Sequence, residues 1–192
     1  MPGEPTATAT CTGPRGETAA PIRLGRPRPG EGRKLWRLAR DCRKLDLNSP
    51  YCYLLWCRDF ARTSVVARAG EAVVGFLTGY VRPDAPDTLF VWQIAVDGAY
   101  RGRRIARRML DHLGLVMTEL GCLHMEATVT PDNVASLRTF ESFARAQGAA
   151  LRRHEGFGSA LFPDHHQPEV LIRIGPLPQR PAPGGTTAPE QE

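Results

Sequence analysis

The chain has 192 residues, 42% hydrophobic and 23% charged, which suits one domain with a buried core. No apolar run is long enough to span a membrane, and residues 1–20 lack the apolar stretch of a signal peptide, so we expect a cytoplasmic protein without membrane association. The net charge of +5 comes almost entirely from arginine, so the location of the charge must decide between nucleic acid and a small anion.

Composition divides the chain into three parts. Residues 1–20 are rich in Thr, Ala, Pro and Gly, and residues 178–192 are rich in Pro and Gly without any periodicity. Such segments bury too little apolar surface to offset the entropy lost on ordering. We therefore predict two disordered tails around one domain at 21–177.

The five cysteines do not indicate a disulfide framework or a zinc site. Their number is odd and they form no CxxC pair: Cys11, Cys42, Cys52, Cys57 and Cys122. We interpret them as buried free thiols in a reducing compartment.

The hydrophobic periodicity predicts a mixed α/β domain. In chain order we expect a strand at 22–26, helices at 31–42 and 51–60, strands at 63–68, 72–81 and 88–96, a helix at 101–120, a strand at 123–130, a helix at 133–147 and a strand at 169–174. Asn48 or Ser49 caps the second helix, with Pro50 in its first turn. Residues 82–87 are predicted to form a polar loop, and one more short strand fits near Leu151.

The most informative segment runs from a strand at Trp92–Val96 into a helix that opens with Arg101, Gly102, Arg103, Arg104 and Ala106. Cations are disfavoured at a helix N-terminus, whose free N–H groups attract anions. An arginine cluster there favours a bound pyrophosphate, with Gly102 and Ala106 permitting close approach. The alternative is a solvated basic surface helix. Neither a Walker A loop nor a GxGxxG fingerprint occurs.

This segment resembles motif A of the GNAT acetyltransferases, [Q/R]-x-x-G-x-[G/A], with Arg104 in place of the middle glycine. The resemblance implies a GNAT fold, a central mixed and mostly antiparallel sheet flanked by helices. It also implies that acetyl-CoA binds the turn, the splayed strand at Ile94–Val96 and Asn133 at the start of a later helix. A backbone amide near Val96 would then stabilise the oxyanion.

Four stretches resemble the diaminobutyrate acetyltransferases of ectoine biosynthesis more specifically: residues 45–60, 73–96, 128–140 and 165–177. The resemblance covers roughly residues 20–177. It implies a homodimer that transfers acetyl to a small diamine, in a pocket formed by Asp46, Tyr51, Trp92, His166 and Glu169. Buried anions suit the ammonium groups of such a substrate, and aromatic rings supply rigid walls.

Each of these residues has a structural alternative. Asp46 could stabilise the turn before the second helix, and Trp92 could be part of the core. His165, His166 and Glu169 could indicate a metal site, but a third ligand is lacking and GNAT chemistry needs no metal. A surface turn is the commoner explanation for such a run.

The expected chemistry is direct acyl transfer in a ternary complex. The ammonium group must lose a proton first, to Glu169, to His166 or to water, with Glu126 as an alternative base. The tyrosine that many GNAT enzymes use to protonate the thiolate is replaced by Phe140, so Tyr51 or water would take that role. Three rival functions stay open: acetylation of another amine, acyl-CoA binding without catalysis, and nucleic-acid binding.

Overall fold

The computed structural model describes residues 20–42, 45–163 and 166–178. The sheet in these residues has seven strands in the order β1-β2-β3-β4-β5-β7-β6. The strands are β1 (Ile22–Gly25), β2 (Val65–Ala69), β3 (Ala72–Arg82), β4 (Ala85–Val96), β5 (His124–Val129), β6 (Leu151–Phe157) and β7 (Glu169–Ile174). The α-helices are α1 (Gly32–Cys42), α2 (Pro50–Arg58), α3 (Ile105–Leu120) and α4 (Val134–Ala146).

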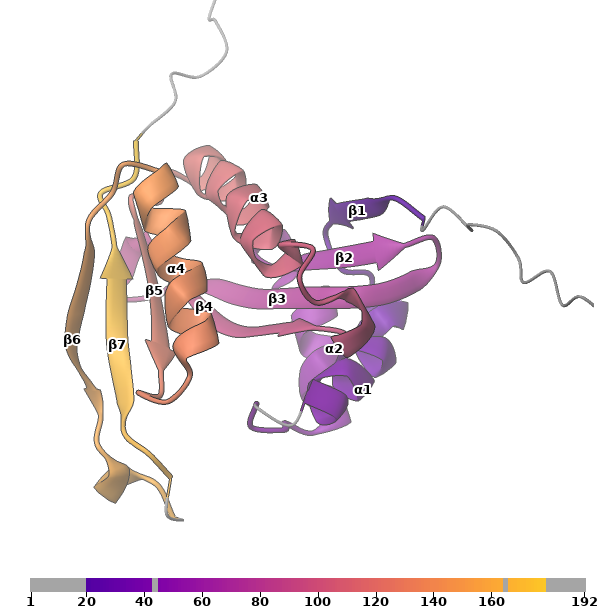
Figure 1. Ribbon diagram of the computed structural model, residues 1–192, viewed down its shortest axis with the longest axis horizontal. Coiled ribbons are helices and arrows are strands. Elements are labelled where there is room, and N and C mark those ends of the chain that lie inside the picture. Colours follow the sequence, from indigo (N-terminus) through magenta and orange to yellow (C-terminus); the bar gives the residue numbers. More distant parts are fainter. Residues whose placement is uncertain (1–19, 43–44, 164–165, 179–192) are drawn as a thin grey trace, which may run out of the picture.

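The sheet is mixed and mostly antiparallel, as predicted. Parallel pairing joins β4 to β5, whereas the other neighbouring strands pair antiparallel. The helices cover both faces of the sheet (Figure 1). On one face, α1 and α2 pack Leu35 and Tyr53 against Phe76 of β3. On the other, α3 and α4 bury a larger apolar cluster that includes Met109 and Phe143.

Helix α2 forms as the sequence predicts. The side chain of Ser49 accepts a hydrogen bond from the backbone N–H of Cys52, and Pro50 occupies the first turn, where its missing N–H costs nothing. Tyr53, Trp56 and Cys57 are buried because residues three and four apart share one helix face. This face fixes α2 against the sheet, next to the segment that carries Asp46.

Two predicted boundaries are wrong. The loop expected at 82–87 is a tight hairpin, because β3 reaches Arg82, which pairs with Ala85 at the start of β4. Arg82 binds both Asp84 and Glu126, so its polar side chain stabilises the hairpin end. Helix α3 begins at Ile105 and not at Arg101, because Arg104 has a left-handed backbone (φ 56°) that no right-handed helix contains.

The strand expected near Leu151 is present as β6, which spans seven residues at the edge of the sheet. The predicted tails lie almost entirely outside the described residues, as does Cys11. The four described cysteines are free, and burial raises the pKa of the Cys57 thiol to about 12. No helix in the described ranges is long and apolar enough to cross a membrane.

Candidate functional site

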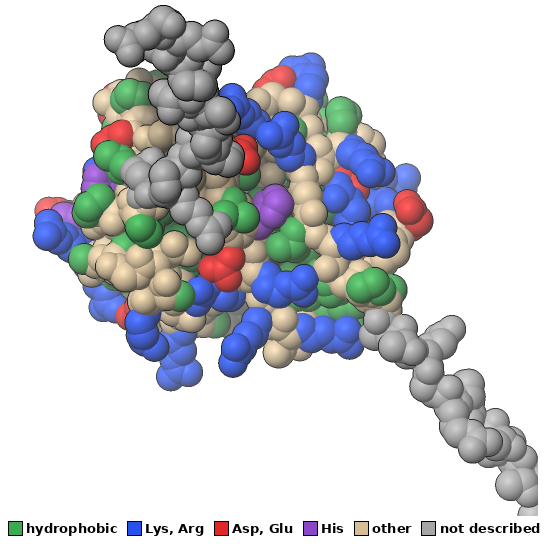
Figure 2. All heavy atoms as spheres, turned by 90° about the horizontal axis from the view of Figure 1, so that it is seen from above, with side chains coloured by type: hydrophobic (Ala, Val, Ile, Leu, Met, Phe, Trp, Pro, Cys, Tyr) green, Lys and Arg blue, Asp and Glu red, His purple; other side chains and the backbone are tan. Residues whose placement is uncertain are grey.

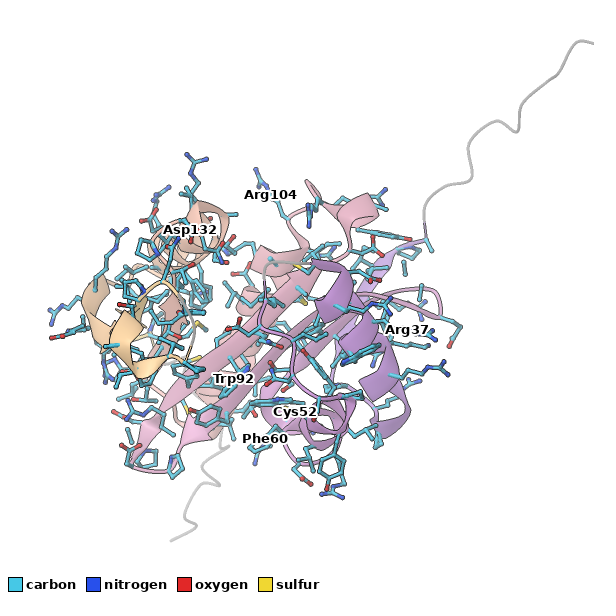
Figure 3. The ribbon with its side chains drawn as sticks, turned by 90° about the horizontal axis from the view of Figure 1, so that it is seen from below. Arg37, Cys52, Phe60, Trp92, Arg104 and Asp132 are labelled. Atoms are coloured by element: carbon cyan, nitrogen blue, oxygen red, sulfur yellow. The ribbon has the colours of Figure 1, made fainter. Side chains whose placement is uncertain are left out.

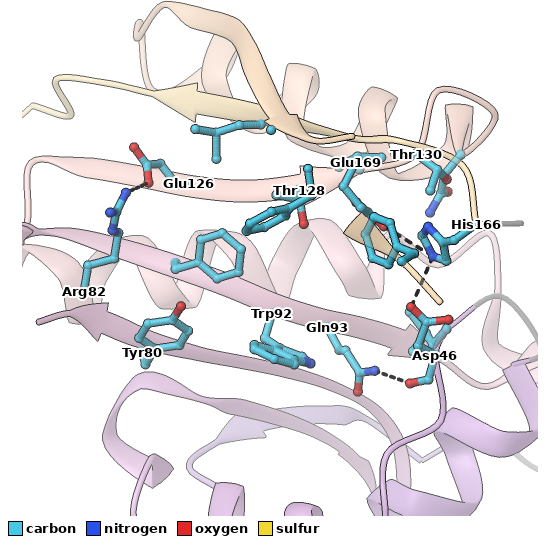
Figure 4. Close-up of a pocket in the computed structure, with 18 of the residues that line it drawn as sticks. Asp46, Tyr80, Arg82, Trp92, Gln93, Glu126, Thr128, Thr130, His166 and Glu169 are labelled. Carbon is cyan, nitrogen blue, oxygen red and sulfur yellow. Dashed lines mark hydrogen bonds and ion pairs between the residues drawn. The ribbon is translucent and has the colours of Figure 1, made fainter. Parts of the chain in front are cut away.

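A pocket of about 700 Å³ lies on the sheet face that carries α1 and α2, between β4, β5, β7 and the connection from β6 to β7 (Figure 4). Four of the five residues that the sequence assigned to a diamine pocket line it: Asp46, Trp92, His166 and Glu169. They come from the segment before α2, from β4, from the segment before β7 and from the start of β7, so the fold gathers residues that are far apart in the chain.

The pocket lies where β4 and β5 separate. Their parallel pairing runs from Thr88 and His124 to Val91 and Ala127. One residue further along β4, Trp92 is the extra residue of a β-bulge, because Val91 faces Gly79 and Gln93 faces Thr78 on β3. Bulges bend a strand and redirect a side chain, and Trp92 is 48% exposed, with its ring centroid 5.9 Å from that of Trp56.

The sequence placed the splayed bulge at Ile94–Val96, and the structure places it at Trp92. Ile94 and Val96 still pair with Leu77 and Gly75 of β3, but they lie beyond the last β4–β5 pair. At Ile94–Val96, the edge of β4 that faces β5 therefore has no strand partner among the described residues, so an extended ligand can pair with its backbone.

Asp46, His166 and Glu169 form one ionic cluster. Nε2 of His166 lies 3.4 Å from Oδ2 of Asp46 and 4.0 Å from Oε1 of Glu169. The ring of His166 stacks on Phe162, with centroids 4.2 Å apart. Nδ1 donates to the main-chain oxygen of Gln167 at 2.5 Å; this bond, with the two carboxylates, raises the pKa of His166. The imidazolium therefore persists to a higher pH than in a free histidine.

Burial raises the pKa of Glu169, against the opposing effects of a hydrogen bond with Thr128 and the charge of His166. A carboxylate with a raised pKa binds a proton more strongly, so it is a better general base near neutral pH. Thr128 was missed by the sequence interpretation, since a threonine on a central strand gives no signal of its own.

Two predicted residues do not suit the roles that the sequence interpretation gave them. Tyr51 is 64% exposed and does not line the pocket, because it precedes Tyr53 by two positions and points away from the buried face of α2. Glu126 is 3% exposed and forms ion pairs with Arg82 and Arg173. Although Glu126 lines the pocket, each of its carboxylate oxygens is bound by an arginine, so neither is free to approach an amine and Glu126 is a poor alternative base.

The predicted anion-binding turn precedes α3. Arg101, Gly102, Arg103 and Arg104 are exposed, and Arg103 stacks over the ring of Tyr100. Arg104 has the left-handed backbone conformation that favours glycine, so the turn keeps a conformation for which the glycine of motif A is suited. Ala106, also in the predicted motif, lies in the first turn of α3.

Asn133 caps α4, because its side chain accepts a hydrogen bond from the backbone N–H of Ser136 at 3.2 Å, and it also lines the pocket. Figure 3 shows Arg104 and Asp132 along the same side of the molecule, so the N-terminal ends of α3 and α4 face one region. Phe140, at the position of the usual tyrosine, is 3% exposed within the core.

Basic side chains are spread over the face shown in Figure 2, with acidic and apolar side chains between them. The described residues contain no group of three or more His, Cys, Asp or Glu side chains that could hold a metal ion. His165, which the sequence interpretation weighed as a metal ligand, lies outside these residues.

Residues 33–144 match the acetyltransferase (GNAT) family. The chain belongs to this family. It is 58% identical over 161 residues to the L-2,4-diaminobutyric acid acetyltransferase of Streptomyces coelicolor, covering 82% of this chain and 95% of that protein. It is 39% identical over 163 residues to the protein of the same name from Halomonas elongata, covering 84% and 85% of the two chains.

The fold matches solved structures as well. The diaminobutyrate acetyltransferase of Paenibacillus lautus, solved with L-2,4-diaminobutyric acid and coenzyme A, has a TM-score of 0.78 and 38% identity, and the match covers 82% of this chain and 96% of that one. Ard1 from Thermoplasma volcanium, at a TM-score of 0.66 and 17% identity, shares the fold.

Proposed function

We propose that this protein transfers the acetyl group of acetyl-CoA to the 4-amino group of L-2,4-diaminobutyrate. The ionic cluster of Asp46, His166 and Glu169 beside Trp92 carries this proposal, because a small diamine needs anions for its ammonium groups and a rigid wall. Relatives of the same name at 58% and 39% identity support it.

The reaction is a direct transfer. Glu169, or His166 in its neutral form, takes a proton from the 4-ammonium group. The free amine attacks the thioester carbonyl carbon, the C–N bond forms, and the C–S bond breaks to release CoA as a thiolate. The described cysteines that are buried, Cys57 and Cys122, have thiols whose pKa burial raises, so neither suits an acyl-carrying nucleophile.

Acetyl-CoA binds where β4 leaves β5. The pantetheine arm lies along the open edge of Ile94–Val96, where a backbone N–H near Val96 stabilises the oxyanion. The pyrophosphate lies on the turn of Arg101, Gly102, Arg103 and Arg104, with Ala106 leaving room at the helix start. Asn133 contacts the cofactor from α4. The buried ring of Phe140 cannot protonate the thiolate, so water takes that role.

In the cell, we place this reaction in the cytoplasm, in ectoine biosynthesis under osmotic stress.

We propose a homodimer, because large apolar side chains are exposed on and near α2: Leu47, Tyr51, Leu54 and Phe60. Tyr51 would then contribute to subunit contacts more than to the pocket of its own chain. Light scattering at several protein concentrations measures this assembly.

Steady-state release of CoA thiol with a panel of amines tests the proposed function. We expect kcat/KM for L-2,4-diaminobutyrate to exceed that for ornithine, lysine and a polyamine. Preference for another amine would retain acetyl transfer but reject this substrate. Binding of CoA without turnover of any amine would reject catalysis.

A further inference from the structure

A buried amide connects the core to the segment that carries Asp46. Gln93 is 6% exposed in β4, in a run that is otherwise largely apolar. Its Nε2 donates to the main-chain oxygen of Asp46 at 2.8 Å (Figure 4). Its Oε1 accepts from the hydroxyl of Tyr53 at 3.1 Å. A buried amide needs both partners, because an unpaired polar atom costs the desolvation of that atom.

Tyr53 holds the oxygen end of the Gln93 amide. Its side chain is fully buried, and its ring meets Phe76 edge-on with centroids 6.1 Å apart. Since the phenol donates to Oε1, the amide nitrogen is left to face Asp46. The reversed amide would direct Oε1 at the main-chain oxygen of Asp46, which can only accept, so this carbonyl sets the orientation of the amide and the Tyr53 hydroxyl donates to the amide oxygen.

The position of the Asp46 carboxylate depends on the hydrogen bond from Gln93. It lies between α1 and α2 in a segment without regular structure, and its side chain is 83% exposed. Packing therefore does little to hold its carboxylate 3.4 Å from His166. The hydrogen bond from Gln93 fixes the main chain of Asp46 and so limits where the carboxylate can lie.

We infer that Gln93, whose amide oxygen is held by the hydroxyl of Tyr53, is a positioning residue that holds Asp46 for recognition of a substrate ammonium group. This inference rests on the proposed function. Gln93 acts through Asp46 and takes no part in the chemistry, so it affects diamine binding much more than acetyl-CoA binding or the acyl-transfer step.

Kinetics of Gln93→Met and Tyr53→Phe test the inference. Gln93→Met keeps the length of the side chain but removes the donor, and Tyr53→Phe keeps the ring that packs on Phe76. We expect KM for the diamine to rise about 3- to 10-fold in Gln93→Met and less in Tyr53→Phe, with KM for acetyl-CoA unchanged and kcat within about 2-fold. Equal increases in both KM values would overturn the inference.

The matched control is Thr63→Val, which removes another buried hydrogen bond to a main-chain carbonyl, from Thr63 Oγ1 to Gly79. It should lower thermal stability without changing KM for the diamine. A double-mutant cycle gives the sharper answer: in an Asp46→Asn background, Gln93→Met should add little to KM. Full additivity would contradict action through Asp46.

Hydrogen exchange tests the role of Gln93 without turnover, so its result does not depend on the proposed function. Amides of residues 45–49 should exchange faster in Gln93→Met and Tyr53→Phe than in the wild type, whatever amine the enzyme uses. Unchanged exchange would overturn the inference. If exchange at residues 45–49 is faster in both variants but the wild type does not turn over diaminobutyrate, only the proposed function is rejected.

Discussion

Nε2 of His166 lies 3.4 Å from Oδ2 of Asp46, although His166 follows β6 and Asp46 precedes α2. This contact joins two segments far apart in the chain across the pocket, and Oε1 of Glu169 lies 4.0 Å from the same ring nitrogen. An ammonium group that enters here meets two carboxylates and one titratable ring.

Asp46→Asn should weaken diamine binding with little effect on acetyl-CoA. The amide keeps the shape of the side chain but removes the negative charge, and a hydrogen bond to a charged group contributes about 1.5–3 kcal/mol. We expect KM for the diamine to rise about 10- to 100-fold. Steady-state kinetics with each substrate varied in turn measure this, and an unchanged KM would remove Asp46 from the site.

Glu169→Gln should reduce kcat about 10²- to 10⁴-fold, the range that a general base contributes. The control is Glu119→Gln, the same change at an exposed position on α3, which should leave kcat unchanged. A large loss of thermal stability in Glu169→Gln alone would instead indicate a structural role.

The pH dependence of kcat/KM should report His166. Its pKa is raised, so the imidazolium persists above the ordinary value of 6.5, and activity that needs the neutral ring falls as the pH drops through this raised pKa. Rates measured from about pH 5 to about pH 9 should show this acidic limb in the wild type. In His166→Gln the limb should move to lower pH, and an unmoved limb would assign it to another group.

Gly156 lets β6 approach the start of β7. A Cβ at this position would lie 2.1 Å from the main-chain oxygen of Glu169. We expect Gly156→Ala to displace Glu169, to reduce kcat, and to lower the free energy of unfolding by about 1–3 kcal/mol. Gly158→Ala is the control, since its Cβ would meet nothing within 4 Å and its φ of −67° suits alanine. Equal effects of both changes in urea denaturation would disprove the close approach.

Arg104 occupies its left-handed conformation at a cost of about 1–2 kcal/mol. Arg104→Gly should raise the free energy of unfolding by about 0.5–1 kcal/mol, because relief of strain exceeds the entropic cost of glycine. Arg104→Val should lower it by about 1–2 kcal/mol, since a β-branched residue tolerates a positive φ least. Urea denaturation of the three proteins should give this order.

The sequence predicted most of the fold because its elements carry local signals. Helix α2 shows its cap and its first proline, and α3 shows an apolar face. Strand β6 was only partly predicted, because its charged residues reflect an edge strand and give no alternating pattern. The end of β3 was missed because Arg82 is stabilised by Glu126, a contact that depends on the folded sheet.

The residues of the candidate site also fall into those that the sequence predicted and those that it did not. Asp46, Trp92, His166 and Glu169 were predicted through resemblance, and the structure brings them into one pocket. Gln93 and Thr128 were missed because each acts through a partner from a distant element. Tyr51 was placed in the pocket because a resemblance gives residue types without the direction of a helix face.

The identity of the acetylated product tests the proposed activity. The protein is incubated with acetyl-CoA and an equimolar mixture of L-2,4-diaminobutyrate, ornithine and lysine, and the products are identified by heteronuclear NMR. We predict that acetyl appears first on the 4-nitrogen of diaminobutyrate. Acetyl on its 2-nitrogen, or first on another amine, would rule out selective acetylation of the 4-amino group of diaminobutyrate.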